Sequence, residues 1–253
     1  MFNWKSLNTC YCYDGTFQGL LTIVFLCYVQ KSFPMQIISS REYQSTLLYE
    51  VINIKTDENR AKRIFNGMVK NISFSSLYHA YYAFLNQSKG KELSILKYIC
   101  YGFLVGPQID TMLSIDFVFH VHQMQKQTLG ECHRLKGLVR FMELDNTVFY
   151  STIHPNHNIL EPLGQHFMRR LPSQNFMIHD KNRNLIFLYH FNKYQITTGI
   201  DIQIPTTSEE EKLYQELWKT FFTTISIKER KNARCQMQYM PKKYWKDLTE
   251  FQK

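Results

Sequence analysis

The feature that most constrains this sequence is a change of hydrophobic period at Gly137. Between residues 57 and 136, apolar side chains recur every three to four positions, the period of an α-helix with one buried face. After Gly137, apolar residues gather in short runs rich in β-branched and aromatic side chains, which favour strands. The sequence therefore predicts an α+β protein in which a helical block packs beside a sheet.

Four helices are expected in the block 57–136. Asp57 can cap the first, and Ser73 or Ser75 can cap the second. The third covers residues 93–104 and stops before Gly106-Pro107, and the long fourth covers about 114–136.

The chain ahead of this block is expected to open with a strand, a turn and a helix. Thr9–Tyr13 is a short run with β propensity, and Thr16–Gln30 has the length of a helix that Phe33-Pro34 would close. Glu50–Lys55 alternates weakly and is expected to form a further strand.

Beyond Gly137 we expect an antiparallel sheet with helices on one face. Asp145-Asn146 is a hairpin signal between two β-rich runs, and a helix should follow Pro155-Asn156. Ser208 with Glu211 forms a capping box for a last helix. The expected strands are Leu138–Leu144, Val148–Ile153, Phe176–His179, Leu185–His190 and Tyr194–Thr197. The last helix carries apolar residues at intervals of four: Leu213, Leu217, Phe221 and Ile225.

We expect one domain over residues 1–253. Its parts are the helical block 57–136, the sheet with its helices 137–225 and a basic aromatic tail 226–253. A chain of this length buries enough apolar surface to fold without disulfides or a structural metal.

The composition points to a polyanionic partner. The 253 residues carry 30 Lys and Arg against 21 Asp and Glu, a formal net charge of +9, and 15% are aromatic. Such a surface suits nucleic acid. An AT-rich genome that favours Lys, Asn, Ile and Tyr codons would produce a similar composition, and composition alone does not separate these two explanations.

The sequence predicts a cytosolic location. Six cysteines are scattered without a C-x-x-C pair, which is typical of buried reduced thiols. The longest apolar run, Leu20–Val29, is too short to span a bilayer and lacks the flanks of a signal peptide. We expect no membrane association.

Several motifs of common enzymes are absent. The sequence has no P-loop, G-x-G-x-x-G, H-E-x-x-H, G-x-S-x-G or zinc-finger spacing. It also lacks the C-x-x-x-C-x-x-C cluster of radical iron–sulfur enzymes. No cofactor is expected from these patterns.

Two basic clusters could bind nucleic acid. The first runs over His133–Arg140 and contributes Arg134, Lys136 and Arg140 near the end of the fourth helix. The second lies in the tail and contributes Arg230, Arg234, Lys242, Lys243, Tyr244 and Trp245. Cations attract phosphates and flat rings stack on exposed bases. The alternatives are that the first cluster neutralises a helix C-terminus and that the tail aromatics anchor a solvated segment to the core.

The spacing of the nine histidines favours a role in proton transfer over a role in metal binding. His120 and His122 are two positions apart and would point to different faces of a helix, so this pair is not expected to chelate a metal. We expect no metal site. If the protein is an enzyme, His133, His157 or His166 would transfer protons while Asp14 or Asp180 orients or activates them.

Motifs along almost the whole chain resemble a bacterial family described as DNA metabolism proteins, a domain of unknown function. They occur in order at Tyr13–Leu21, His133–Phe141, Pro155–Leu160, His166–Arg170, Asp180–Arg183, Trp218–Phe222, Ile227–Asn232 and Gln236–Trp245. His154 stands where the pattern has an acid, so it is not assigned to a shared site. Ala233 replaces the proline expected after Asn232.

The resemblance implies a partner more than a reaction. Such proteins are typically encoded beside a radical S-adenosylmethionine protein thought to act on DNA, and some are fused to a uracil-DNA-glycosylase-like domain. We therefore expect a DNA-repair or DNA-metabolism accessory protein that binds DNA. The alternatives are an enzyme acting on damaged DNA, which would flip its target nucleotide out of the helix, and a protein-interaction subunit that never contacts DNA.

Overall fold

The computed structural model describes residues 4–43, 49–144, 148–198, 209–230 and 232–252. The chain divides into two compact units, residues 1–129 and 130–253. The division falls inside one helix, α5 (Asp116–Leu138), and each unit has its own hydrophobic core. The α+β class is confirmed, while the expectation of one folding domain stays a prediction.

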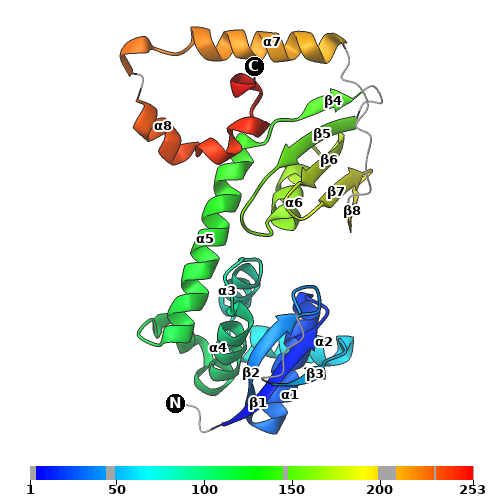
Figure 1. Ribbon diagram of the computed structural model, residues 1–253, viewed down its shortest axis with the longest axis vertical. Coiled ribbons are helices and arrows are strands. Elements are labelled where there is room, and N and C mark those ends of the chain that lie inside the picture. Colours follow the sequence, from blue (N-terminus) through cyan, green and yellow to red (C-terminus); the bar gives the residue numbers. More distant parts are fainter. Residues whose placement is uncertain (1–3, 44–48, 145–147, 199–208, 231, 253) are drawn as a thin grey trace. The chain divides into compact units, whose positions relative to one another are not determined.

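The N-terminal unit is built on a three-stranded parallel sheet of order β2-β1-β3 (Figure 1). Helix α1 (Phe17–Gln30) connects β1 (Lys5–Tyr13) to β2 (Ser32–Ser39), as parallel strands require. Strand β3 (Glu50–Asn53) pairs with the other edge of β1. The expected opening strand, helix and later strand are confirmed.

Strand β2 was not expected, because Pro34 was interpreted as a helix stop alone. Pro34 lies opposite Leu7 in the outermost strand of the sheet. An edge strand tolerates proline because one side of its backbone needs no ladder partner. The chain reverses at Lys31, which adopts a left-handed conformation with φ 53°.

The predicted helical block is confirmed. It consists of α2 (Glu58–Asn71), α3 (Phe74–Phe84), α4 (Lys91–Val105), the short helix η1 (Gly106–Thr111) and α5. Asp57 and Ser73 cap α2 and α3 by accepting hydrogen bonds from the amides of Arg60 and Ser76. The buried faces of α1, α2 and α4 share one core with β1. None of the described helices is long and apolar enough to cross a membrane.

The C-terminal unit contains a mixed five-stranded sheet of order β4-β5-β6-β7-β8. Its strands are β4 (Met142–Leu144), β5 (Val148–Ile153), β6 (Asn175–Asp180), β7 (Leu185–His190) and β8 (Lys193–Thr198). The hairpin of β4 with β5 and the meander β6-β7-β8 are antiparallel, as predicted. Asp145-Asn146, the expected turn, lies outside the described residues.

The prediction of an antiparallel sheet is wrong at one pair of strands, β5 and β6, which are parallel. Helix α6 (Leu160–Arg170) lies between these strands in the sequence. It returns the chain to the end of the sheet at which β5 begins, so β6 can run in the same direction. The strand predicted at Leu138–Leu144 is also too long. Leu138 still belongs to α5 because it is buried on the same helical face as Leu135.

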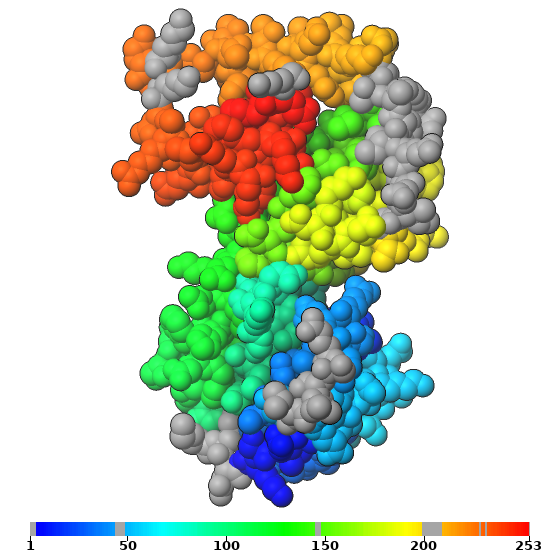
Figure 2. Space-filling view, in the orientation of Figure 1, coloured from blue at the N-terminus to red at the C-terminus, as the bar shows by residue number. Residues whose placement is uncertain are grey.

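The tail has more helical structure than expected. After α7 (Glu209–Thr224) come η2 (Lys228–Arg230), α8 (Ala233–Tyr239), η3 (Lys242–Asp247) and η4 (Thr249–Phe251). Figure 2 shows the end of the chain, in red, against α7, in orange. The predicted α7 forms, but its leucine face is exposed, because Trp218 and Phe222 on another side of the helix contact Glu250 and Phe251.

Candidate functional site

Glu131 joins the two predicted basic segments of the C-terminal unit. It lies on α5, is 2% exposed and receives hydrogen bonds from the Lys243 ammonium at 2.7 Å and the Tyr244 phenol at 2.6 Å. The backbone amides of Asn156 and His157 donate to the same carboxylate at 3.0 and 2.7 Å. Burial opposes its charge, but these four donors outweigh burial and hold the pKa of Glu131 at about 2.

The first basic cluster and part of the tail therefore lie side by side. Arg134, one turn after Glu131, lies beside the Tyr244 phenol and is exposed. Lys243 is half-exposed despite its ion pair with Glu131. Tyr244 is only 1% exposed and cannot stack on a base without leaving the core. Its role is structural, because its phenol binds Glu131 beneath the exposed Arg134.

A second group of positive charges surrounds His166 on α6. Burial lowers the pKa of His166, and the nearby charges of Lys136, Arg169 and Arg170 lower it further. Arg169 and Arg170 are exposed and Lys136 is half-buried. In the described part of the chain none of these three cations pairs with an acid. The end of α5 thus meets the basic end of α6.

Arg140 is held by an internal partner. Its guanidinium makes a two-pronged ion pair with Glu250, with donor–acceptor distances of 2.8 and 3.2 Å, and lies over the Trp218 ring. It also lines a surface recess of about 260 Å³ between α7 and η4. Because the Glu250 side chain is 1% exposed, Arg140 compensates a buried charge and is not free to bind a phosphate.

The remaining tail residues differ in how accessible their side chains are to a ligand. Arg230, Arg234 and Lys242 are exposed and have no acid partner among the described residues. Trp245 stacks on Phe251 with ring centroids 4.3 Å apart, and its indole N–H donates to a backbone carbonyl. One face of the Trp245 ring is thereby covered.

The residues proposed for catalysis are divided between the two units. Asp180 is fully buried and pairs with Arg183 at 2.8 Å, which fixes the turn after β6. Asp14 belongs to the N-terminal unit, where it accepts hydrogen bonds from Thr16 and Thr56. Neither carboxylate pairs with a histidine in the described parts of the chain.

The three histidines of the catalytic hypothesis have separate surroundings. His133 is exposed on α5 and makes no hydrogen bond to another described residue. The amide of His157 binds Glu131, and His166 lies among the cations described above.

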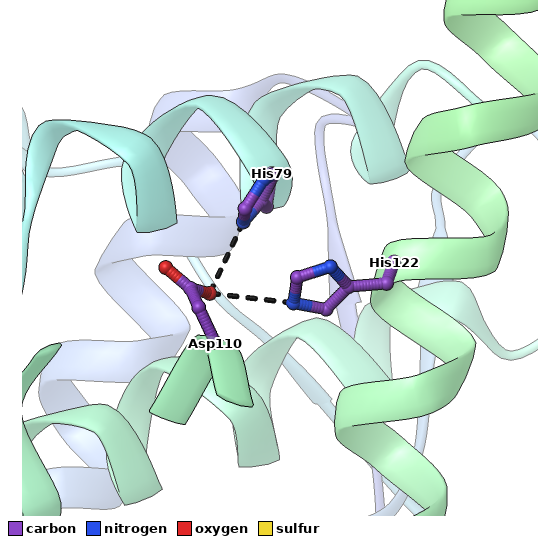
Figure 3. Close-up of side chains that lie close together, drawn as sticks. All are labelled: His79, Asp110 and His122. Atoms are coloured by element: carbon purple, nitrogen blue, oxygen red, sulfur yellow. Dashed lines mark hydrogen bonds and ion pairs between the residues drawn. The ribbon is translucent and has the colours of Figure 1, made fainter. Parts of the chain in front are cut away.

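The N-terminal unit contains a cluster that the sequence did not predict (Figure 3). Asp110 in η1 lies between His79 from α3 and His122 from α5, with nitrogen–oxygen distances of 3.1 and 3.3 Å. Ser76 and Tyr98 donate hydrogen bonds to the same carboxylate. Burial opposes the charge of Asp110, but its contacts with the two imidazoles and the two hydroxyls outweigh burial and hold its pKa far below the ordinary value.

The cluster could hold a metal ion, because the two imidazole nitrogens and the carboxylate oxygen lie within 4.8 Å of one another. The expectation that His120 and His122 do not chelate together is compatible with this cluster, since only His122 takes part. His79 and Asp110 are 31 residues apart and have no characteristic spacing, so the sequence carried no signal for the site.

Comparison with known proteins identifies a family without an assigned activity. Residues 89–250 match DUF4130, a domain of unknown function. No curated protein and no solved structure matches the chain. Since the matched region covers more than half of the sequence, this chain belongs to the DUF4130 family.

Proposed function

We propose that this protein is a DNA-metabolism accessory protein that binds DNA through its C-terminal unit. The observation that carries the proposal is the meeting of basic segments around the end of α5. Lys136 lies with Arg169 and Arg170 around His166, and Arg134 lies beside Tyr244. Like charges held together without an acid repel one another, and a phosphate backbone would relieve that repulsion.

The predicted binding residues would have two different tasks. Five of them would contact phosphates: Arg134, Lys136, Arg230, Arg234 and Lys242. Arg169 and Arg170, which were not predicted, would join them. Tyr244, Lys243 and Arg140 are occupied by Glu131 and Glu250 and would hold the surface in shape. Tyr239, which is exposed on α8, is better placed than Tyr244 or Trp245 to stack on a base.

A salt series of DNA binding tests the proposal. Binding of a labelled duplex would be followed by fluorescence anisotropy between about 50 and 200 mM salt, where each phosphate contact contributes roughly 0.9 to the slope of log K against log salt. The double variant Arg169→Gln/Arg170→Gln should flatten that slope by about 1.8, since two contacts are lost.

A charge-matched control comes from the N-terminal unit. The double variant Lys62→Gln/Lys70→Gln loses the same two charges from exposed positions on α2 and should keep the wild-type slope. Equal losses in both doubles would mean that only net charge matters, and the assignment to α5 and α6 would be wrong. Failure of the wild-type protein to bind single- or double-stranded DNA at low salt would favour a protein-interaction subunit instead.

The proposed partner is a radical S-adenosylmethionine protein, on the basis of the sequence resemblance. Co-elution of the two purified proteins in gel filtration, with and without DNA, tests this part separately. If DNA binds but the pair does not co-elute under either condition, the partner is wrong and the DNA-binding proposal stands. A uracil-DNA-glycosylase-like protein can be tested as a second partner in the same way.

A further inference from the structure

We propose that His79, Asp110 and His122 form a mononuclear site for a divalent transition metal, with Zn²⁺ as the best-matched ion. The site lies in the N-terminal unit and does not depend on the proposed DNA binding. Two imidazoles and one carboxylate, with water in the fourth position, form a common ligand set of zinc sites. Neither the family match nor any motif of the sequence assigns this site.

The distances fit a coordination sphere. Zinc binds imidazole nitrogen at 2.0–2.1 Å and carboxylate oxygen at 2.0–2.2 Å, so neighbouring ligand atoms of a tetrahedral site are about 3.3 Å apart. The carboxylate oxygen of Asp110 lies 3.1 Å from Nδ1 of His79 and 3.3 Å from Nε2 of His122. The centroids of the two imidazole rings are 4.3 Å apart, and the ring planes make an angle of 50°.

A purely hydrogen-bonded cluster leaves one atom unsatisfied. Nε2 of His122 is buried 3.3 Å from a carboxylate oxygen of Asp110, and this contact does not meet the geometry of a full hydrogen bond. Buried polar atoms without a partner are rare in folded proteins. A metal ion between the three side chains would accept the lone pair of this nitrogen, which would then no longer be a buried polar atom without a partner.

The surroundings of Asp110 resemble the second shell of a metal site. Ser76 donates to the second carboxylate oxygen at 2.8 Å, and the buried Tyr98 phenol donates to the first. Hydrogen bonds of this kind orient a ligating carboxylate and keep it ionised. The three ligand side chains are 16–22% exposed, so the cluster is not sealed from solvent, which could supply the fourth ligand.

Metal uptake by the full-length protein tests the site. Protein stripped with a chelator would be titrated with Zn²⁺ by calorimetry and with Co²⁺ by visible absorption. Cys235, the exposed cysteine, would be replaced by serine in every sample. We expect one equivalent of each metal, with Co²⁺ d–d bands and no sulfur-to-metal charge transfer, because the proposed ligands are nitrogen and oxygen.

Variants on α3 and α5 provide the matched comparison. Loss of a group that only orients a ligand typically weakens metal binding tenfold to one-hundredfold. Since His79→Gln and His122→Gln each remove a ligand, each should weaken Zn²⁺ binding by at least this much. His120→Gln, two residues from His122 on α5 but exposed, should bind as wild type. Tyr98→Phe removes only a donor to Asp110 and should weaken binding by about tenfold.

The outcomes that overturn the site are specific. They are no saturable uptake of one Zn²⁺ by the wild-type protein, wild-type affinity in both His79→Gln and His122→Gln, or an equal loss in His120→Gln. Circular dichroism of each metal-free variant distinguishes a lost ligand from a lost fold. A variant that unfolds would be replaced by His122→Asn, scored by the same titration.

Discussion

Replacing Glu131 by glutamine should destabilise the C-terminal unit by about 3 kcal/mol at neutral pH. The pKa of Glu131 falls from 4.5 to about 2 in the folded protein, and each pH unit corresponds to about 1.36 kcal/mol. The ionised form therefore contributes roughly 2.5 times this value. The substituted side chain keeps the size of glutamate but loses its charge, and its NH₂ group replaces one of the two accepting oxygens. If the remaining oxygen keeps the bonds from Asn156, Lys243 and Tyr244, the NH₂ group faces the His157 amide, donor against donor.

The pH dependence distinguishes this explanation from a general packing defect. Because the folded pKa is lowered, the stabilisation is fully present above about pH 4.5 and is lost as the pH falls toward 2. The gap in unfolding free energy between wild type and Glu131→Gln should therefore narrow through this window. The control Glu216→Gln, an exposed position on α7, should show no gap at any pH.

Tryptophan fluorescence can report this unit alone. Two of the three tryptophans, Trp218 and Trp245, lie in residues 130–253, and the third is Trp4. Urea unfolding in a Trp4→Phe background would therefore follow the C-terminal unit. Two results would refute the conclusion that Glu131 is ionised and stabilises this unit. One is a difference in unfolding free energy that is as large at pH 3 as at pH 7, and the other is no destabilisation at pH 7.

Three further outcomes follow from the same structure for the C-terminal unit, and one for the metal site. Gly164→Ala should destabilise the C-terminal unit by about 1–3 kcal/mol in urea unfolding, because its Cβ would lie 2.4 Å from the Phe187 ring. By contrast, Gly137→Ala, whose Cβ meets nothing within 4 Å, should stabilise helix α5 by up to about 1 kcal/mol. The pKa of His166, followed by NMR, should rise toward its ordinary value when the two arginines at the end of α6 become glutamines, and an unchanged pKa would contradict their proximity. Zn²⁺ should raise the melting temperature of the wild-type protein but not that of His122→Gln, and equal shifts would place the metal elsewhere.

Local chemistry made much of the fold predictable. The caps at Asp57 and Ser73 act within three residues of themselves, and the apolar spacing of the helical block shows directly which face is buried. The strands of the C-terminal sheet were likewise recognisable as short runs. For α7 the same spacing predicted the helix but not its exposure, because exposure depends on which partner the helix meets.

The candidate sites were only partly predictable. The two basic segments were visible as clusters of charge, yet which cations remain free depended on acids far away in the chain. Glu131 contacts Lys243 across 112 residues, and Arg140 contacts Glu250 across 110. Arg169 and Arg170 were not among the predicted binding residues, because their approach to Lys136 required the packing of α6 against α5 within the C-terminal unit.

The sequence by itself determined most of the helices and strands, though not β2 or the tail helices, together with the excess of positive charge and the positions of the basic segments. Only the tertiary structure decided that β5 and β6 run parallel, that Tyr244 is buried and that His79, Asp110 and His122 meet. The reason is the range of the interactions. Propensity, capping and periodicity act over a few neighbouring residues, whereas pairing of strands and burial of side chains depend on contacts that close only when distant segments pack together.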